Sequence, residues 1–484
     1  MGLLELKRFS VMARAARRFV SVLPVVLCAA APVHGYATHT VGEGDSLALI
    51  AERYLPYTAS YTRGELVTQI RELNALGSGR ISIGQDLVIP VIRSEPLKPG
   101  TMAKTKDFAA RGIYVNQKNA GTRTVFALAG RLKASGANTV VFDAKEVNGV
   151  PAYRSAIPAT VTPAAHGDHS IQEIAKLVDG LHAMGVHVAA RVCVFRDRLM
   201  ASSMQDWRYN GEWVDPANAE VQAYNLELIR ELVGLGVDEI QLDYFRYPAD
   251  GRTDTGVPGK ERSDILAEYL AQIHELTSSH RVLLSLDLFG IVSWQRSADI
   301  SVLGQDVHKM MDHLDVISPM LYPSHFGKDF DGIANPADEP YYFVKEGVTR
   351  LKAIVQNRVI VRPWLQSFPL RVTTGYDAGY VRAQVDAARD AGSTGWLLWS
   401  PGNRYDEAFA ALEALNAETL AVSEAAGEEL PARSVQPGME TRPRERKNGG
   451  SAQESNLPRT LDAPHTGFEV RGTHQNPTAS TGDT

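Results

Sequence analysis

The sequence is poor in cysteine and has no excess of positive charge. Its 484 residues include only two cysteines, Cys28 and Cys193, too few for a disulfide framework or a zinc site built from cysteine. Lys and Arg number 50 against 56 Asp and Glu, so the formal net charge is −6, and there is no long basic run. This balance argues against a nucleic-acid partner. A mean hydropathy of −0.18 excludes a multi-span membrane protein.

Two kinds of cofactor motif are also missing. No apolar run is followed by G-x-G-x-x-G or G-x-x-x-x-G-K, so we expect no nucleotide cofactor. No histidines have the H-x-x-x-H or H-E-x-x-H spacing of metalloenzymes, so we expect no metal site. Any chemistry must then come from ordinary side chains.

The N-terminal residues have the pattern of a secretory signal. Five basic residues between positions 7 and 18 precede an apolar run from Phe19 to Ala31, and small residues follow it. This order is typical of a signal peptide, which we place at residues 1–37. The run is shorter than the ~20 residues of a membrane span, and Pro24 interrupts it; a retained anchor is the alternative. We therefore expect a periplasmic or secreted protein associated with the cell wall, with no stable membrane span after cleavage.

Residues 38–92 predict a small module of two helices between two short strands. A strand at 39–41 leads into a Gly-Asp-Ser turn, two amphipathic stretches follow, and Gly-Gln-Asp-Leu-Val-Ile-Pro closes the segment. This order and both end motifs resemble a LysM domain. The resemblance implies binding of a glycan containing N-acetylglucosamine, such as peptidoglycan, in a groove formed by Gly44, Asp45, Ser46 and Asn74. The alternative is that these four residues only form turns and helix caps.

Two segments are expected to lie outside any folded domain. Residues 93–104 contain Pro96, Pro99 and Gly100 and predict a linker. Residues 421–484 are rich in Pro, Gly, Ser, Thr and mixed charge, without an apolar period, and predict a disordered tail. We assign no function to either segment.

Residues 105–420 predict an α/β fold. Eight short apolar runs alternate with amphipathic stretches, and the runs are 112–115, 139–142, 186–190, 239–242, 282–286, 316–320, 359–362 and 395–399. Strands that alternate with helices predict a parallel sheet covered by helices, and eight such units fit a (β/α)8 TIM-type barrel. A doubly wound open sheet is the alternative, which the missing glycine-rich phosphate loop disfavours.

In such barrels the functional groups lie at the carboxyl ends of the strands. Charged, amide and aromatic side chains gather at the expected ends. We expect the following to bind substrate: Asp143, Lys145, Arg191, Asp197, Arg246, Tyr322, His325, Trp364, Gln366 and Trp399. Aromatic faces stack on sugar rings and the polar groups bind hydroxyls, so this set favours a carbohydrate.

Two carboxylates stand out because they end neighbouring strands. Glycoside hydrolysis uses one ionised and one protonated carboxyl group, and Asp243 and Asp287 are the best pair. We expect Arg191 and Arg246 to lower the pKa of Asp243, and burial near Phe289 or Trp294 to raise that of Asp287. The alternative for Asp287 is a helix cap.

Five strings along the predicted barrel strengthen this interpretation. They are V-F-D-A-K-E at 141–146, E-I-Q-L-D-Y-F-R-Y-P at 239–248, D-L-F-G at 287–290, I-S-P-M-L-Y-P-S-H at 317–325 and R-P-W-L-Q at 362–366. They resemble a bacterial family of glycoside hydrolases catalogued mainly as a domain of unknown function. The resemblance implies a TIM barrel distantly similar to the alpha-amylase clan, with Asp243 as nucleophile and Asp287 as acid/base. That clan uses Glu where this chain has Asp287.

Three functions are compatible with these features. We favour an exported hydrolase of cell-wall or exported polysaccharide, held on its glycan by the LysM module. A non-catalytic glycan-binding envelope protein is the main alternative. A metal-dependent deacetylase or amidase is the third, and the histidine spacing disfavours it.

Overall fold

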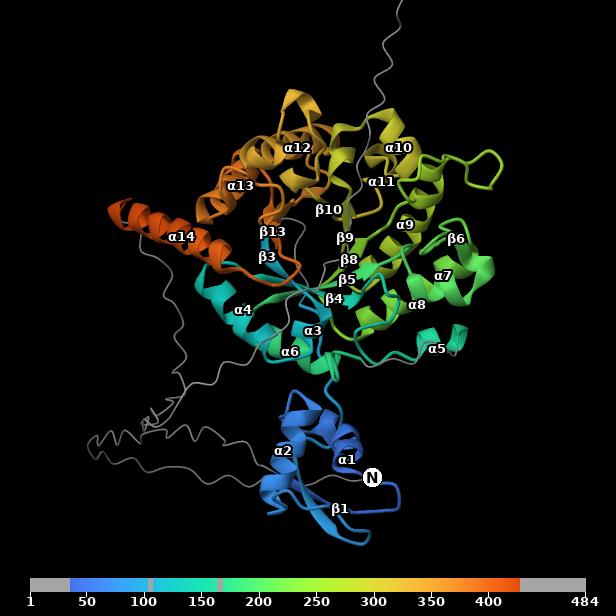
Figure 1. Ribbon diagram of the computed structural model, residues 1–484, viewed down its shortest axis with the longest axis vertical. Helices are drawn as coiled ribbons and strands as arrows, with labels where there is room; N and C mark the ends of the chain where they lie inside the picture. Colours follow the sequence, from blue (N-terminus) through green and yellow to red (C-terminus); the bar gives the residue numbers. More distant parts are fainter. Residues whose placement is uncertain (1–34, 103–107, 163–168, 427–484) are drawn as a thin grey trace, which may run out of the picture.

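The computed structural model describes residues 35–102, 108–162 and 169–426 (Figure 1). Residues 1–34 of the expected signal segment 1–37, and residues 427–484 of the expected tail 421–484, lie outside these residues; residues 421–426 are the end of a helix. Figure 1 shows a small N-terminal module, drawn in blue, beside a larger body in which helices surround the strands. Within the described part of the chain, no helix is both long and apolar enough to cross a membrane.

The N-terminal module has the expected β-α-α-β order. Strand β1 (Gly35–Thr40) pairs antiparallel with β2 (Asp86–Val91), and α1 (Leu47–Tyr54), the 3-10 turn η1 (Leu55–Tyr57) and α2 (Arg63–Leu73) lie between them. Its buried core has the spacing expected of amphipathic elements and includes Leu47, Ile50, Ala51, Leu66, Ile70, Leu87 and Ile89. Strand β1 begins at Gly35, three residues before the predicted boundary at 38.

The larger body is a closed parallel barrel. Its strands are β3 (Ala110–Val115), β4 (Thr139–Lys145), β5 (His187–Cys193), β8 (Glu239–Asp243), β9 (Leu283–Leu288), β10 (Val316–Pro319), β11 (Ile360–Val361), β12 (Trp364–Gln366) and β13 (Gly395–Trp399). They follow the order β11-β10-β9-β8-β5-β4-β3-β13-β12. The (β/α)8 prediction is confirmed.

The seventh barrel strand is split, which explains why eight units give nine strands. Strand β11 pairs with β10, and β12 pairs with β13. Between them lie Arg362 and Pro363, and Pro363 has no N–H for the ladder. The break is bridged because the Arg362 amide donates to the carbonyl of Ile317 and the Pro363 carbonyl accepts from Leu397. The two pieces therefore close the sheet on itself.

Helices cover the barrel on the outside (Figure 1). They are α3 (Gln117–Ala120), α4 (Thr124–Ala134), α5 (Ile157–Val161), α6 (Ile174–Ala183), α7 (Arg198–Ser203), α8 (Ala219–Gly234), α9 (Arg262–Ser279), α10 (Ser297–Leu303), α11 (Val307–Met310), α12 (Pro340–Val355), α13 (Ala378–Asp390) and α14 (Asp406–Ala426). A short hairpin of β6 (Arg208–Asn210) and β7 (Trp213–Val214) lies between α7 and α8. Strands such as β5 are buried along their whole length because both sheet faces are covered.

The module docks onto the rim of the barrel where the strands end. Tyr61 donates to the carbonyl of Ala120, which follows β3, and Glu65 makes two hydrogen bonds of 2.8 and 2.9 Å with Arg123. Lys176, in the first turn of α6, donates to the carbonyl of Leu55 at 2.5 Å. Burial of this amine lowers its pKa to about 8. These barrel residues belong to the connections after β3 and β4, so the module sits on the side where a TIM barrel carries its site.

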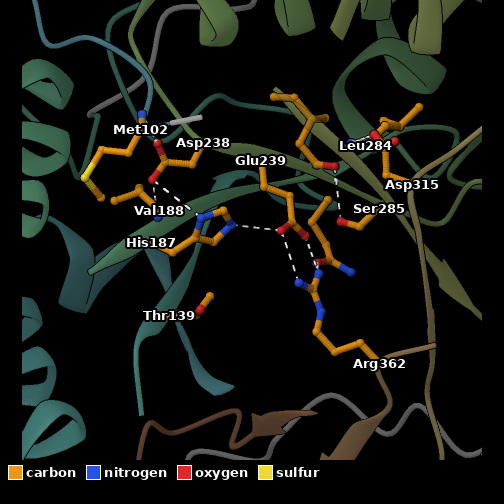
Figure 2. Close-up of polar contacts among 12 residues, drawn as sticks. Met102, Thr139, His187, Val188, Asp238, Glu239, Leu284, Ser285, Asp315 and Arg362 are labelled. Atoms are coloured by element: carbon orange, nitrogen blue, oxygen red, sulfur yellow. Dashed lines mark hydrogen bonds and ion pairs between the residues drawn. The ribbon is translucent and has the colours of Figure 1, made fainter. Parts of the chain in front are cut away.

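The predicted linker is held against the opposite end of the barrel. Thr101 donates to the carbonyl of Val237 at 3.1 Å, and the Met102 amide donates to Asp238 at 2.5 Å. Figure 2 shows Met102 next to Asp238. Asp238 also accepts from the amide of Val188 at 2.8 Å. The end of this segment is therefore bonded to the loop that precedes β8.

Candidate active site

The site lies inside the barrel at the carboxyl ends of its strands. Side chains alternate along a strand, so on β8 Ile240 and Leu242 pack in the apolar layer while Glu239, Gln241 and Asp243 contact polar groups of other strands. The register Leu242↔Leu286 places the next residues, Asp243 and Asp287, side by side on β8 and β9. Two carboxyl groups therefore lie side by side at the edge of the sheet where the strands end.

Asp243 is ion-paired with Arg191. The Nε and Nη2 of Arg191 donate to Oδ2 of Asp243 at 3.0 and 2.7 Å. The same guanidinium reaches Oδ1 of Asp143 at 2.5 Å and Oε1 of Glu146 at 3.2 Å. One buried cation therefore serves three carboxylates. Burial raises the pKa of Asp143 to about 6, although Arg191 and a hydrogen bond from Tyr114 oppose this shift.

The backbone after Asp243 fixes its second oxygen. Tyr244 has a φ of +50°, in the left-handed region that residues with side chains seldom occupy. Its amide donates to Oδ1 of Asp243 at 2.6 Å. Both oxygens of Asp243 are thus held, and a strained residue next to a carboxylate is a frequent feature of functional sites.

Within the described part of the chain no cation pairs with Asp287, and its side chain is held by neutral donors. Its Oδ1 accepts from Nε2 of Gln241 and from Nε1 of Trp364, both at 2.5 Å. The side chain of Gln305 donates to the Asp287 carbonyl at 3.1 Å. Burial, reinforced by the negative charge of Asp243, raises the pKa of Asp287 well above its ordinary value. The protonated form of this carboxyl is therefore favoured.

Aromatic rings surround the two carboxyl groups. Tyr114 stacks on Trp399 with ring centroids 3.8 Å apart, and Trp364 meets Trp399 edge-on at 5.5 Å. Arg191 lies 5.0 Å from the centroid of the Trp399 ring. Trp399 is only partly buried, so one wall of the site offers an aromatic surface.

Two more predicted binding residues lie at the edge of this group. Arg246 is stacked between Trp213 and Phe289, with its guanidinium carbon 4.9 and 4.8 Å from their centroids. His325 is exposed and meets the ring of the buried Tyr322 edge-on at 5.1 Å. Both stay predictions as substrate contacts.

Three predicted binding residues make contacts of another kind. Lys145 and Asp197 are 2% and 1% exposed and pair with each other at 2.7 Å. Lys145 also reaches Asn225 of α8, on the helical side of the sheet. The β4–β5 register shifts between Asp143 and Lys145, which turns Lys145 away from the face that Asp143 occupies. Gln366 is fully buried and accepts from the Ser324 amide at 3.1 Å, so it joins two loops.

Residue-by-residue prediction omitted two contacts of the site. Gln241 donates to Asp287, and Tyr114 donates to Asp143. Gln241 lies midway between Glu239 and Asp243, and this period of two is the signal that could have found it. Tyr114 carries no such signal because the residues on either side of it, from Gly112 to Val115, form an apolar run.

The four predicted glycan-binding residues of the module shape its turns. Gly44 has a φ of +82°. Asp45 accepts from the Gly42 amide at 2.9 Å, and Ser46 caps α1 by accepting from Leu49 at 3.2 Å. Asn74 exchanges two hydrogen bonds with the backbone of Val88, at 2.8 and 2.7 Å. Glycan contact by these residues remains a prediction.

Paired carboxyl groups and aromatic rings at the strand ends of a closed parallel barrel are the features of the glycoside hydrolase class. Residues 112–405, more than half of the chain, match the family described as "Putative glycosyl hydrolase domain", and the chain belongs to this family. Residues 39–90 match the LysM domain. Both suspected families are thereby confirmed. No curated protein matches the sequence.

Several solved structures are similar to the chain. A hypothetical protein from Ruminiclostridium thermocellum ATCC 27405 is 30% identical over 37% of this chain and 99% of that one, with a TM-score of 0.33. The PgaB (BpsB) glycoside hydrolase domain from Bordetella bronchiseptica is 13% identical over 65% and 97%, with a TM-score of 0.47. The spore cortex-lytic enzyme SleL of Bacillus megaterium QM B1551 is 12% identical over 78% and 85%, with a TM-score of 0.41.

Proposed function

We propose that the protein is an exported glycoside hydrolase that cleaves cell-wall or exported polysaccharide, with Asp243 as nucleophile and Asp287 as acid/base. The observation that carries this proposal is the contrast between the two neighbouring carboxyl groups. Asp243 is paired with Arg191 at 2.7 Å, whereas Asp287 is held by uncharged donors and has a raised pKa. One group is thus suited to attack and the other to donate a proton.

We propose a retaining reaction for two carboxyl groups that end neighbouring strands. Adjacent strands lie about 4.8 Å apart, and Asp243 and Asp287 occupy equivalent places on β8 and β9. Retaining enzymes have their carboxyl groups ~5–5.5 Å apart, whereas inverting enzymes need ~6.5–9.5 Å to admit a water molecule. The anomeric form of the first product decides between these two spacings.

The proposed reaction has two steps. Asp287 gives its proton to the glycosidic oxygen while Asp243 attacks the anomeric carbon, so the leaving sugar departs as an alcohol and a glycosyl ester forms on Asp243. Asp287, now ionised, then takes a proton from water as the water oxygen attacks the same carbon and releases Asp243. Arg191 donates two hydrogen bonds to Oδ2 of Asp243 and stabilises the carboxylate that the second step regenerates.

The LysM module supports a polymeric substrate. Its contacts with Ala120, Arg123 and Lys176 fix it on the rim where the strands of the barrel end. A glycan bound there would be held near the site and would raise the local concentration of scissile bonds. We therefore propose N-acetylglucosamine-containing glycan, such as peptidoglycan, as the ligand of the module. The alternative is a barrel that binds glycan without cleaving it.

The test is hydrolysis by the full chain. We would incubate it with peptidoglycan and with amino-sugar and neutral polysaccharides, and measure new reducing ends and the anomeric form of the first product by NMR. Asp243→Asn and Asp287→Asn should lose about 10²–10⁴-fold in rate, while the matched change Asp312→Asn, in an exposed surface pair with Arg358, should lose nothing. Glycan binding without new reducing ends would favour the non-catalytic alternative.

Export is tested separately from activity. The proposed signal segment should be absent from the mature protein, so N-terminal sequencing of protein from a periplasmic or culture fraction should begin near residue 32 or 36, after one of the two small-residue stretches at 29–31 and 33–35. Full-length protein recovered from the membrane fraction would instead indicate a retained anchor.

A further inference from the structure

We propose that Gln241 is a positioning residue that determines which oxygen of Asp287 carries the proton, and that the Glu239–Arg362 ion pair at the floor of the barrel holds Gln241 in the required orientation. This inference rests on the proposed function of Asp287 as the acid. It connects two groups of buried residues at opposite ends of the barrel interior.

The floor of the barrel holds an ion pair with no access to water. Glu239 is fully buried and Arg362 is 1% exposed. Nη1 of Arg362 donates to Oε2 of Glu239 at 3.1 Å, and Nη2 donates to Oε1. His187 lies 2.9 Å from the same Oε2, and Figure 2 shows these three side chains converging. Arg362 and His187 hold the pKa of Glu239 well below its ordinary value, so the pair stays charged.

Arg362 also determines how Gln241 points. Its Nη2 lies 3.4 Å from Oε1 of Gln241. A guanidinium carries only donors, so the amide oxygen must face it. The amide nitrogen then faces the other way and donates to Oδ1 of Asp287 at 2.5 Å. A flipped amide would set N–H groups against the guanidinium and leave Asp287 without this donor.

The orientation of Gln241 decides where Asp287 is protonated. Oδ1 of Asp287 already accepts from Gln241 and from the indole of Trp364, which can only donate. A hydrogen on Oδ1 would clash with the two hydrogens that Gln241 and Trp364 donate to this oxygen. The acidic hydrogen of Asp287 therefore belongs on Oδ2. No described residue donates to Oδ2. The floor pair therefore acts through Gln241 to present one defined O–H to the leaving group.

The first experiment titrates Asp287 directly in the full chain. The carboxyl carbons of aspartate would be labelled with ¹³C, and the Asp287 signal assigned by its loss in Asp287→Asn. Gln241→Met keeps the length of the side chain and removes its donor. Because that donor favours the ionised carboxyl, its loss should move the Asp287 titration upward by roughly one to two pH units. Ser285→Ala is the matched control, since buried Ser285 on β9 donates to the Ile240 carbonyl at 3.2 Å and is not among the described donors to the Asp287 carboxyl group. An unchanged titration in Gln241→Met would overturn the proposal.

A double-mutant cycle tests the connection to the floor. Arg362→Lys keeps the charge and loses the planar guanidinium, so it should move the Asp287 titration in the wild-type background and leave it unmoved when Gln241 is already Met. Equal shifts in both backgrounds would show that Arg362 does not act through Gln241. Thermal unfolding of each variant identifies one that fails to fold, and Gln241→Met alone still tests the first link.

Activity provides an independent measurement. Gln241→Met should lower kcat by ~10-fold or more with little change in KM, and should move the basic limb of the pH profile upward with the titration. A kcat loss without any displacement of that limb would indicate a structural role and contradict the proposal. If the wild type cleaves no glycan, the proposed function fails, while the titration still decides whether Gln241 controls Asp287.

Discussion

The two ends of the barrel interior are built from the same residue types but differ in charge balance. At the floor, Arg362 faces one carboxylate, Glu239, which also contacts His187. At the mouth, which is the end of the barrel that holds Asp243 and Asp287, one arginine, Arg191, contacts three carboxylates. Burial opposes ionisation of the carboxyl groups at both ends. How many cations pair with each carboxyl group therefore decides whether that group is ionised.

The pKa shifts follow this balance. The pKa of Glu239 is held well below its ordinary value, whereas that of Asp143 is raised to about 6 and that of Asp287 is raised well above its ordinary value. Opposite shifts within one barrel separate a structural ion pair from a reactive group. A buried carboxyl without its own cation is therefore the better candidate for proton transfer than one inside a complete pair.

Removing the cation at the mouth should have the largest effect. Arg191→Met leaves Asp143, Asp243 and Glu146 without a counter-ion, and breaking a buried pair destabilises by about 3–5 kcal/mol. The free energy of unfolding, measured in urea at pH 7 and pH 5, should fall by less at pH 5 because the stranded carboxylates can then protonate. An equal loss at both pH values would show that Arg191 contributes mainly through packing.

Removing the anion at the floor should also cost less stability at low pH, but only in a more acidic range. Glu239→Gln leaves Arg362 buried and unpaired, and we expect a loss of about 3 kcal/mol at pH 7. Because the folded-state pKa of Glu239 is depressed, its contribution is complete above the unfolded value of about 4.3 and is lost as the pH falls below it. The difference between wild type and variant should therefore shrink below about pH 4.3. A constant difference down to pH 2.5 in urea titrations would contradict this account.

Sequence patterns located the barrel and its carboxyl pair more securely than they oriented individual side chains. Asp243 and Asp287 were found because parallel strands bring their carboxyl ends to one edge. Lys145 was placed with them because it lies at the end of the same strand as Asp143, and the register shift between these two residues turns it to the other face. Gln241 was passed over because its role depends on Arg362, 121 residues away, whose contact no local pattern records.

Asp143→Asn should weaken the pH dependence of the free energy of unfolding that the raised pKa of Asp143 causes. The Glu239–Arg362 pair at the floor does not cause this dependence. The folded pKa of Asp143, about 6, lies above its ordinary value of 3.8. The folded state therefore holds this proton more tightly, and its stabilising effect is present below the unfolded value and lost as the pH rises through about 6. The shift corresponds to roughly 3 kcal/mol. In Asp143→Asn the free energy of unfolding, measured by urea titration at half-unit pH steps, should change less between pH 4 and pH 6 than in the wild type. A slope identical to that of the wild type would assign this pH dependence to Asp287 alone.

The smallest loss of stability should come from removing the hydroxyl of Tyr114, an uncharged donor at the mouth. Tyr114 donates to Asp143 and stacks on Trp399, and Tyr114→Phe keeps the ring while removing the hydroxyl. A hydrogen bond to a charged group contributes about 1.5–3 kcal/mol, but near pH 6 Asp143 is ionised for only part of the time, so we expect about 1 kcal/mol at that pH. Because the hydroxyl favours the ionised carboxyl, its loss should raise the pKa of Asp143 and increase the destabilisation from pH 5 to pH 8. A cost that does not grow with pH would mean that the hydroxyl does not distinguish the two forms of Asp143, and Arg191 alone would then determine its charge.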